Sequence, residues 1–548
     1  MKNFKDIIAA VASGVTIEEG QYQTATLEPK QLRAAAEELR KAGYDFLNNL
    51  TGIDNGESLG VVYHIAKSDN LTDMVVLKTN TADRENPLLY TVCDLWKSAD
   101  LYEREVYDFY GIRFINHPDM RRIFLRADWQ GFPFRKDYDP ASNSMPTTNV
   151  DIDSLESMPT ITINEDGKIV EKENKLFGPN EYIVNFGPQH PATHGVLHLR
   201  VSLDGETVKK VDPNFGYIHR GIEKMSESMT YPQILPYTER LDYLSGAMNR
   251  HALCMCVEKA LGIEVPKRAQ YVRVIFDELT RIASHLLGWG SMTMDMGAIT
   301  AFIYGMRDRE EIMKIFEETA GGRLMTSYSV IGGLAEDVHP DFKQHVQEFI
   351  PYMRKMMKEH HQIFTGNPIA TGRMHNVGWL TKETAVALGT TGPTGRASGW
   401  HCDIRKIEPY SAYMEPGVQA TFKEMLRNTD TNKGDTFDRY LIRLDEIEES
   451  LNIIEYLINN LPDGDFKAKV PAMIKLPEGE YYQRIENARG EFAVYIKSDG
   501  GKNPARIKFR SPCMTLISAL DPLCQNEKIA DLIMIGGSLD YVIPCADR

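Results

Sequence analysis

A short stretch near residue 190 constrains the fold more than any other part of the chain, because glycine and proline set its backbone. Proline fixes φ and disfavours helix in the residue before it, while glycine adopts turns that other residues avoid. Apolar, strand-like residues lie before it at 182–184 and after it at 196–201. The pattern predicts a shaped loop that presents histidine and threonine side chains, a good place for chemistry. The stretch reads Phe186-Gly187-Pro188-Gln189-His190-Pro191-Ala192-Thr193-His194-Gly195.

The two histidines of this loop, His190 and His194, are four residues apart. That spacing binds metal when a helix stacks the two rings, and Pro191 makes this segment a loop instead. The simplest interpretation of either residue alone is a structural histidine that caps its own loop.

Length and composition exclude several classes of protein. A chain of 548 residues exceeds one hydrophobic core and indicates two or more domains. Its net charge of -15 argues against nucleic-acid binding, which depends on clustered Lys and Arg. We expect no signal peptide and no spanning helix, since no apolar run approaches roughly 18 residues. The expected protein is soluble, or is the soluble part of a larger assembly.

The seven cysteines are scattered and contain no C-x-x-C pair. This argues against a disulfide framework and favours a reducing compartment. It also argues against a zinc or iron–sulfur site made by this chain alone, so we predict no metal ligands here. Cys254 and Cys256 lie in a helical pattern that points them to different faces, which favours inert core residues.

The first region, residues 1–140, is predicted to be a small α+β domain. A helix is expected at 30–43, strands at 60–66, 73–79 and 88–93, and a helix from Ala99 to Tyr110. An aromatic and arginine-rich tail follows at 111–138; it either wraps a partner or folds onto its own domain. Residues 141–176 are predicted to be a linker, with a hairpin at 160–170.

The second region, residues 177–548, is predicted to be mainly a helical bundle with flanking β structure. Tyr243 is expected on a helix that ends at Gly262, and Asp295 in a loop after the next helix. Further helices are expected at about 306–319, 341–364 and 434–461, with β structure from Glu480 onward. The second helix carries alternating charges at i, i+4 steps, interpreted as a solvated or interfacial salt-bridge stripe, at Arg273, Asp277, Arg281 and His285.

Spacing alone assigns no substrate to these residues, but two sets of motifs resemble one known family. The motifs of the second region are the histidine loop from Gly187 to Gly195, 216–224, 240–244, 295–298 and 486–491. Those of the first region are Glu103-Arg104-Glu105, Asp108, 111–112, 117–118, 121–123 and 128–138. With these motifs the second region resembles the D subunit (49 kDa type) of NADH–quinone oxidoreductase, respiratory complex I. The first region resembles the C subunit (30 kDa type), so the chain resembles a fused C/D subunit.

The resemblance implies a quinone-reduction site in which Tyr243 and His194 face the quinone headgroup and Asp295 pairs with His194. His190, Thr193 and Gly195 would belong to the loop that forms one wall. The residue types suit the chemistry, because negative charge developing on quinone oxygens in a dry pocket needs positioned donors. It also implies the [NiFe] hydrogenase large-subunit fold for this region.

Arg240 corresponds to a family arginine beside the terminal [4Fe–4S] cluster, which a partner holds. Met325 stands where many family members have a histidine, and methionine cannot titrate. We hypothesise a lower-potential, less pH-dependent cluster suited to menaquinone. A second departure is Tyr541, which replaces the proline of the Ser-Leu-Asp-Pro run near the family's C-terminus and puts pocket contacts there in question.

The implied partners are the B subunit with the terminal cluster, the I subunit, the H and A membrane subunits, and an electron-input module. This chain would bind no cluster itself. It would lie peripherally at the cytoplasmic face of the bacterial inner membrane and act as part of a proton-translocating NADH–quinone oxidoreductase.

Two alternatives remain at this stage. A [NiFe] hydrogenase large subunit needs four thiolates, but the corresponding positions hold Asp242, Ser245, Val542 and Cys545. A non-catalytic assembly scaffold is the other alternative, in which partners alone handle the quinone.

Overall fold

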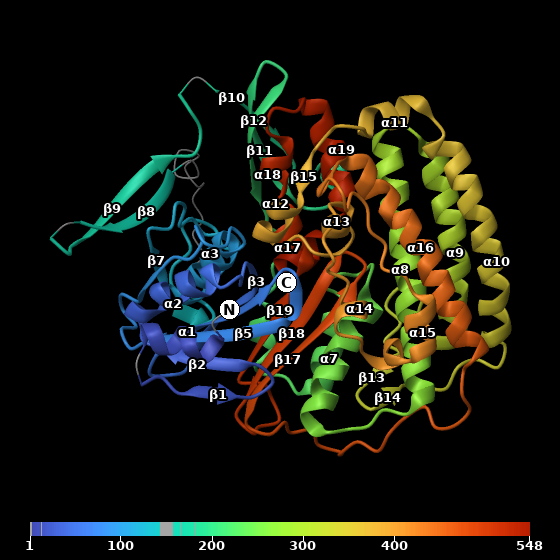
Figure 1. The fold of residues 1–548 in the computed structure, drawn as a ribbon, viewed down its shortest axis with the longest axis horizontal. Helices are drawn as coiled ribbons and strands as arrows, with labels where there is room; N and C mark the ends of the chain where they lie inside the picture. The colour runs from blue at the N-terminus through green and yellow to red at the C-terminus, as the bar shows by residue number, and fades with distance from the viewer. Residues whose placement is uncertain (1–2, 13, 143–156, 165, 180) are drawn as a thin grey trace.

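The structure is a computed structural model that describes residues 3–12, 14–142, 157–164, 166–179 and 181–548. A sheet-rich N-terminal region lies on one side of the molecule, and a bundle of long helices lies on the other (Figure 1). Between them stand the three antiparallel strands β17, β18 and β19, whose bounds are Gly479–Asn487, Gly490–Ser498 and Arg506–Arg510. The predicted α+β class is confirmed at this level.

The N-terminal region is built on a five-stranded sheet in the order β1-β2-β5-β4-β3. Only β2 and β5 run parallel; the other pairs are antiparallel. The strands are β1 (Ile17–Glu19), β2 (Gln23–Leu27), β3 (Phe46–Asp54), β4 (Leu59–Lys67) and β5 (Asn70–Thr81), and the flanking elements are α1 (Phe4–Val11), α2 (Pro29–Lys41), β6 (Leu88–Tyr90), α3 (Ala99–Tyr110) and β7 (Arg113–Ile115).

Helices α2 and α3 follow local sequence rules. In α2, Pro29 occupies the first turn, Glu28 and Gln31 form a capping box, and one apolar stripe is buried. Helix α3 ends where Gly111 takes a left-handed conformation with φ 75°. Both predicted helices and the strands at 60–66 and 73–79 are confirmed, whereas the sequence reasoning missed β1, β2 and β3.

The aromatic tail after α3 folds onto its own region. The Asp108 carboxylate accepts backbone N–H groups of Ile123, Phe124 and Leu125, and it pairs with Arg122 at 2.8 Å. Phe134 stacks on Phe109 at 4.1 Å. The predicted hairpin after the tail is also present, as β8 (Ser157–Ile163) and β9 (Ile169–Lys175), which project from the body (Figure 1). Part of the predicted linker, residues 143–156, lies outside the described residues.

The second region contains the long helices that form the bundle. Helix α8 packs against α9, α16 and α19, and α10 packs against α9 and α16. Leu444, Ile447, Leu451, Ile454 and Ile458 of α16 are all buried, which confirms the predicted core seam. The helices of at least eight residues here are α6 (Tyr231–Thr238), α7 (Gly246–Leu261), α8 (Lys267–Asp295), α9 (Ile299–Ala320), α10 (Phe342–His360), α16 (Thr436–Asn459) and α19 (Ile529–Leu539).

Shorter elements complete this region. Strands β10 (Tyr182–Phe186) and β11 (His198–Asp204) flank the histidine loop as predicted. Strand β12 (Thr207–Asn214), which the sequence reasoning missed, completes a three-stranded sheet with them. The remaining elements are two 3-10 helices (Pro191–Thr193 and Ser411–Met414), α5 (Ile222–Ser226), β13 (Ser329–Val330), β14 (Gly333–Leu334), a π-helix (His361–Thr365), α11 (Pro368–Met374), β15 (Leu380–Thr381), α12 (Lys382–Leu388), α13 (Gly392–Ala397), α14 (Ile404–Ile407), α15 (Pro416–Thr421), β16 (Lys433–Gly434), α17 (Pro512–Ser518), α18 (Leu520–Cys524) and α20 (Ile543–Asp547).

Four expectations for this region are wrong. Helix α7 begins at Gly246, so Tyr243 lies in the turn before it, and α8 continues through its glycines so that Asp295 is its last residue. The β structure after Glu480 ends at Arg510, and short helices follow it. The charged ladder of α8 is buried rather than solvated, because carboxylates from other segments pair with its members, as Glu258 does with Arg273 and Glu446 with His285.

A buried ionic cluster and a shared core join the two regions. Glu105 of α3 pairs with Lys508 of β19 and, at 2.8 Å, with Arg548. Glu223 of α5 contacts Arg506 at 2.8 Å in the same cluster. One hydrophobic core runs from Phe4 through the N-terminal sheet into the C-terminal helices. The predicted boundaries divide the chain into 1–140, 141–176 and 177–548. The hydrophobic core is continuous across these boundaries, so the division stays a prediction.

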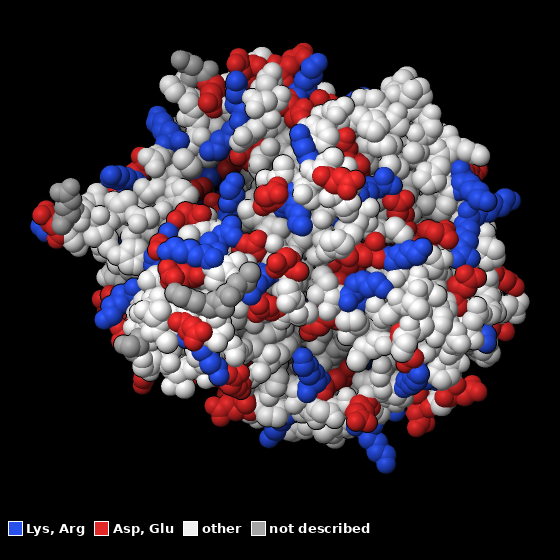
Figure 2. Space-filling model, viewed as in Figure 1, with Lys and Arg blue, Asp and Glu red and all other residues white. Residues whose placement is uncertain are grey.

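Charged side chains are spread over the face of the molecule that Figure 2 draws, with basic and acidic groups interspersed. Within the described ranges, no helix combines the length and apolar character that crossing a membrane requires.

Candidate functional site

The histidine loop connects β10 to β11 and is held by its own hydrogen bonds. The last pair of the two strands is Phe186 with Leu199. Thr193 is almost fully buried, and its hydroxyl donates to the carbonyls of His190 and Gly195, at 2.8 and 2.9 Å. Thr193 thus fixes the shape of the loop. His190 is exposed and its ring meets that of Phe186, whereas His194 contacts the helical region through Asp295.

His194 and Asp295 form the direct contact that was predicted from the resemblance. The Nε2 atom of His194 lies 2.6 Å from Oδ2 of Asp295, the last residue of α8. The His194 side chain keeps 22% of its surface exposed, against 8% for Asp295. Residues 101 positions apart in sequence therefore form one short, partly exposed hydrogen bond.

The surroundings of His194 favour its charged form. Burial lowers the pKa of this imidazole, but the hydrogen bond and charge of Asp295, with the charge of Asp540, outweigh burial and raise the pKa above its ordinary value. An imidazolium with a raised pKa is a proton donor near neutral pH.

Tyr243 lies on a cavity of about 510 Å³ together with two other predicted residues, Arg240 and Met325. The cavity is also lined by Tyr217 and Pro544, among others. Burial raises the pKa of Tyr243, and the nearby Arg489 guanidinium partly opposes this, so the phenol keeps its proton at neutral pH. Arg240 is exposed beside the cavity and Met325 is half-buried.

No hydrogen bond between described residues joins Tyr243 to the His194–Asp295 pair. Asp540 links them electrostatically instead, because its charge raises the pKa of both His194 and Tyr243. Its carboxylate accepts from Arg489 at 3.3 Å. The sequence reasoning did not select Asp540 or Arg489, although Arg489 lies within one of the quoted motifs.

Arg489 holds this side of the site together. It is fully buried, and one of its terminal nitrogens donates to Asp242 at 3.0 Å, to Ser245 at 3.3 Å and to Ser284 at 3.0 Å. Asp242 immediately precedes Tyr243. The guanidinium thus anchors the turn that presents the tyrosine.

Close packing of α19 on α8 brings the two acidic groups near each other. A Cβ on Gly537 would lie 3.4 Å from Oδ2 of Asp295, and one on Gly288 would lie 3.0 Å from Asp540. Glycine permits this approach because it has no side chain. Tyr541, the departure noted in the sequence, is buried, and its pKa is raised first by burial and also by the charges of Cys524 and Asp295.

The side chains at the positions that would hold nickel in a hydrogenase make other contacts in this structure. Asp242 and Ser245 bind the Arg489 guanidinium, and a cation in that place opposes a metal ion. Cys545 is buried 3.0 Å from the Ser511 hydroxyl. Cys254 and Cys256 are fully buried core residues, and burial raises the pKa of each thiol to about 12.

One group of possible metal ligands lies elsewhere, at Cys93, Glu103 and His117. Nδ1 of His117 accepts the backbone N–H of Asp119 at 3.1 Å, so Nε2, which faces Glu103, carries the ring proton. That tautomer does not fit a metal bound at Nε2.

Comparisons with known proteins decide the family. A family model described as the 49 Kd subunit of respiratory-chain NADH dehydrogenase matches residues 295–475 and 469–548, and one described as its 30 Kd subunit matches residues 25–144. The C/D subunit of NADH-quinone oxidoreductase from Phocaeicola vulgatus is 54% identical over 505 residues, covering 92% of this chain and 95% of the relative. The chain belongs to this C/D subunit family.

Two further relatives agree with that assignment. The C/D subunit from Bacteroides thetaiotaomicron is 53% identical over 515 residues, covering 92% of this chain and 95% of the relative. A separate D subunit, from Desulforamulus reducens, is 45% identical over 363 residues, covering 66% of this chain and 97% of the relative. The predicted fused C/D family is thus confirmed, and the chain is a component of an NADH-quinone oxidoreductase.

Proposed function

We propose that the chain forms the quinone-reduction site of its complex, with Tyr243 and His194 as hydrogen-bond and proton donors to the quinone headgroup. The observation that carries the proposal is the 2.6 Å contact between His194 and Asp295 at the loop wall. Raised pKa values support the donor role, since each shift favours the protonated form of the side chain.

The chemistry follows from charge. Two-electron reduction places negative charge on the two quinone oxygens, and an unpaired charge in a poorly hydrated pocket is costly. A phenol O–H and an imidazolium N–H stabilise that charge and supply protons. Asp295 keeps the imidazole protonated and oriented, and Thr193 keeps the loop in shape through its bonds to His190 and Gly195.

The electrons would come from the terminal [4Fe–4S] cluster of the B subunit, which would deliver them one at a time. We place that cluster beside the cavity lined by Arg240 and Met325. The Arg240 cation suits a neighbouring negatively charged cluster and would raise its potential. Met325 neither titrates nor donates a hydrogen bond, so we assign a lower-potential, less pH-dependent cluster and menaquinone as substrate. Redox titration of the native complex tests this, because a pH-dependent, high-potential terminal cluster would contradict it.

The assembly follows from the family. We propose the B and I subunits, the H and A membrane subunits and an electron-input module as partners, at the cytoplasmic face of the bacterial inner membrane. Within that assembly the complex translocates protons. We further propose the domain division at 140 and 176, and the hydrogenase large-subunit fold for residues 177–548.

The test uses the assembled complex with His194→Ala and, as its matched control, His190→Ala in the same loop. We expect His194→Ala to lower quinone reduction by about 100-fold, the range for loss of a general acid. His190→Ala should stay near the parent rate, because the His190 side chain is exposed and its ring meets that of Phe186. Subunit composition is measured in parallel to show that assembly is intact.

The scaffold alternative predicts a different outcome. If His194→Ala and Tyr243→Phe both leave quinone reduction unchanged in a fully assembled complex, the chain serves assembly only and the proposal fails. Metal analysis of the isolated chain tests the hydrogenase alternative, since stoichiometric nickel would be needed for it.

A further inference from the structure

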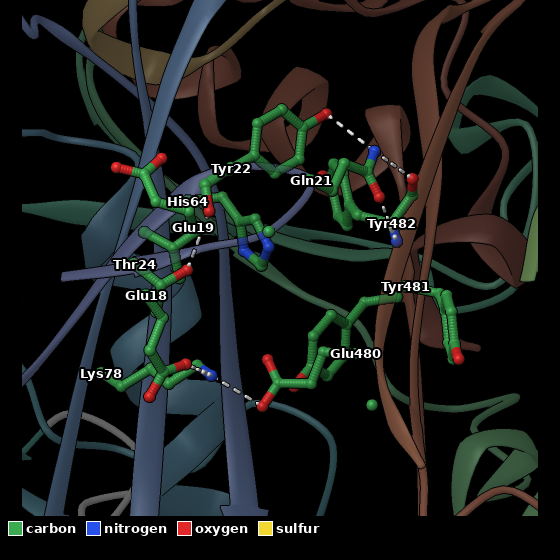
Figure 3. A pocket seen from close by; sticks show the side chains of 14 residues that line it. Glu18, Glu19, Gln21, Tyr22, Thr24, His64, Lys78, Glu480, Tyr481 and Tyr482 are labelled. Carbon is green, nitrogen blue, oxygen red and sulfur yellow. Dashed lines mark hydrogen bonds and ion pairs between the residues drawn. The ribbon is translucent and has the colours of Figure 1, made fainter. Parts of the chain in front are cut away.

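A second cavity, remote in sequence from the histidine loop, lies where the N-terminal region meets β17 and β18. It has a volume of about 270 Å³. The strands β1, β2, β4 and β5 form one side of it and β17 and β18 the other (Figure 3). Its size lies near the lower end for ligand sites, which are roughly 300–1,000 Å³. A ligand here would contact both regions of the molecule at once.

Aromatic side chains supply one part of its wall. His64 stacks on Tyr482 with ring centres 4.3 Å apart, and the edges of Tyr22 and Tyr495 approach His64 at 6.4 and 5.7 Å. Tyr481 follows Glu480 in β17, but its ring is directed to the other face of the strand (Figure 3). Burial lowers the pKa of His64 to about 3, with help from the charges of Lys78 and Arg484, so this ring is neutral. The half-buried ring of Tyr22 is the one that a cation can approach, since a tyrosine face attracts positive charge.

Carboxylates supply acceptors at one edge of the cavity. Glu480 pairs with Lys78 at 2.9 Å, whereas Glu18 lies 3.9 Å from the same ammonium and keeps 65% of its side chain exposed. Figure 3 shows the carboxylates of Glu18 and Glu480 on either side of Lys78, and that of Glu19 directed away. Two carboxylates against one ammonium leave this edge negative.

The polar groups above this edge are already engaged. The Gln21 amide donates to the Tyr482 carbonyl at 2.7 Å and to the Tyr22 hydroxyl at 3.3 Å, and its oxygen accepts from the Tyr482 N–H at 3.2 Å. The wall therefore offers carboxylate oxygens, the half-buried ring of Tyr22 and Nδ1 of His64, which is buried without a hydrogen-bond partner among the described residues. That combination selects a ligand with positive charge and its own N–H groups.

We propose that this cavity binds a small free organic cation, an amine or guanidine carried on a short apolar chain. The apolar chain lies against His64 and the tyrosines, and the cationic head reaches Glu18 and Glu480. Bound there, the ligand ties the N-terminal sheet to β17 and stabilises the junction between the two regions. The site is independent of the proposed quinone chemistry.

Calorimetric titration of the purified full-length chain with butylguanidinium tests the proposal, and butylurea serves as the neutral probe of the same shape. We expect saturable binding of butylguanidinium in roughly the millimolar range and at least about tenfold weaker binding of butylurea. Equal binding of the two probes, or no saturable binding of either, overturns the proposal.

Neighbouring glutamates give a matched pair of variants. Glu18→Gln is expected to weaken butylguanidinium binding about fivefold or more, whereas Glu19→Gln leaves it unchanged, since Glu19 is paired with Lys5 at 2.7 Å. Tyr22→Phe should keep affinity and Tyr22→Leu should lose it, because the ring face is what the ligand uses. Unchanged affinity in both Glu18→Gln and Tyr22→Leu contradicts the site.

The same titration on the intact complex separates a free ligand from a neighbouring protein's side chain. Binding by both the isolated chain and the complex supports a free small cation. If the isolated chain binds butylguanidinium and the complex does not, a basic side chain of a partner fills the cavity in the complex. That result overturns the proposal that the ligand is a free small cation. Quinone reduction of Glu18→Gln should equal that of the parent complex, so failure here and failure of the proposed quinone site are distinguishable.

Discussion

His194 and His285 each contact one carboxylate, at 2.6 Å from Asp295 and at 3.0 Å from Glu446. Their surroundings differ. The His194 side chain is 22% exposed and its neighbours are acidic, whereas His285 is fully buried with arginines around it. The pKa of His194 is raised and that of His285 is lowered. A histidine–carboxylate contact therefore does not by itself make a proton donor.

Burial is the main cause of the lowered pKa of His285. Glu446 opposes burial, but its charge is shared with Arg396, which pairs with it at 2.6 Å, and Arg281 and Arg443 repel the imidazolium. His285 thus remains neutral as part of a structural network. His194 has one carboxylate to itself and a second, Asp540, nearby. The exposed pair is suited to proton transfer, and the buried pair is suited to fixing the bundle.

The largest expected effect is a loss of folding stability when Glu446, the carboxylate of the buried pair, is removed. Glu446→Ala leaves Arg396 with less compensation in the interior, and losing one partner of a buried ion pair costs about 3–5 kcal/mol. Thermal unfolding of the isolated chain should show a much lower midpoint. The control is Glu455→Ala on the same helix, whose pair with Arg354 is partly exposed, so its cost should stay within about 1 kcal/mol. Equal midpoints for the two variants would contradict the structural role of Glu446.

The next largest effects are expected when each histidine is replaced by alanine, one on stability and the other on the rate of quinone reduction. His285→Ala should lower the unfolding midpoint, and complexes that still assemble should reduce quinone at nearly the parent rate. His194→Ala should do the reverse, with about 100-fold loss of rate at nearly unchanged stability. Thermal unfolding and steady-state quinone reduction, measured on both variants, check this. Similar effects of both substitutions on the rate would remove the distinction.

Tyr243→Phe should have a smaller effect, about tenfold to 100-fold on the rate of quinone reduction, because one donor is lost and the other remains. Tyr217→Phe is the matched control, since Tyr217 lines the same cavity and is 52% exposed. The assay is quinone reduction by the assembled complex. A rate for Tyr243→Phe equal to that of Tyr217→Phe would show that the phenol does not donate to the substrate.

Local sequence rules predicted much of the fold. Neighbours within a few turns determine three of these features: the apolar stripe of α2, the end of α3 at Gly111 and the core seam of α16. Periodicity and glycine placement were therefore sufficient to predict them. The buried ladder of α8 was misjudged because the partners of its charges come from distant segments, as Glu446 does for His285. Tyr243 was placed on a helix because apolar spacing continues across the turn.

The site was predictable only in part. Resemblance selected His194 and Asp295, and their contact depends on a fold that joins positions 101 apart in the sequence. Nothing local in the sequence marks Asp540 as a neighbour of both donors, since α19 reaches α8 through the small surfaces of Gly288 and Gly537. Tertiary packing supplies that information.

The smallest expected change, a shift in pH dependence, tests the central claim most directly. Asp295 raises the pKa of His194, so the protonated form persists to higher pH than for an ordinary histidine, and quinone reduction should fall as pH rises through that raised pKa. Asp295→Asn removes the charge, so the fall should move to lower pH. The measurement is the pH–rate profile of quinone reduction for the parent and Asp295→Asn complexes. A displaced high-pH limb supports His194 as the proton donor, and coincident profiles would contradict it.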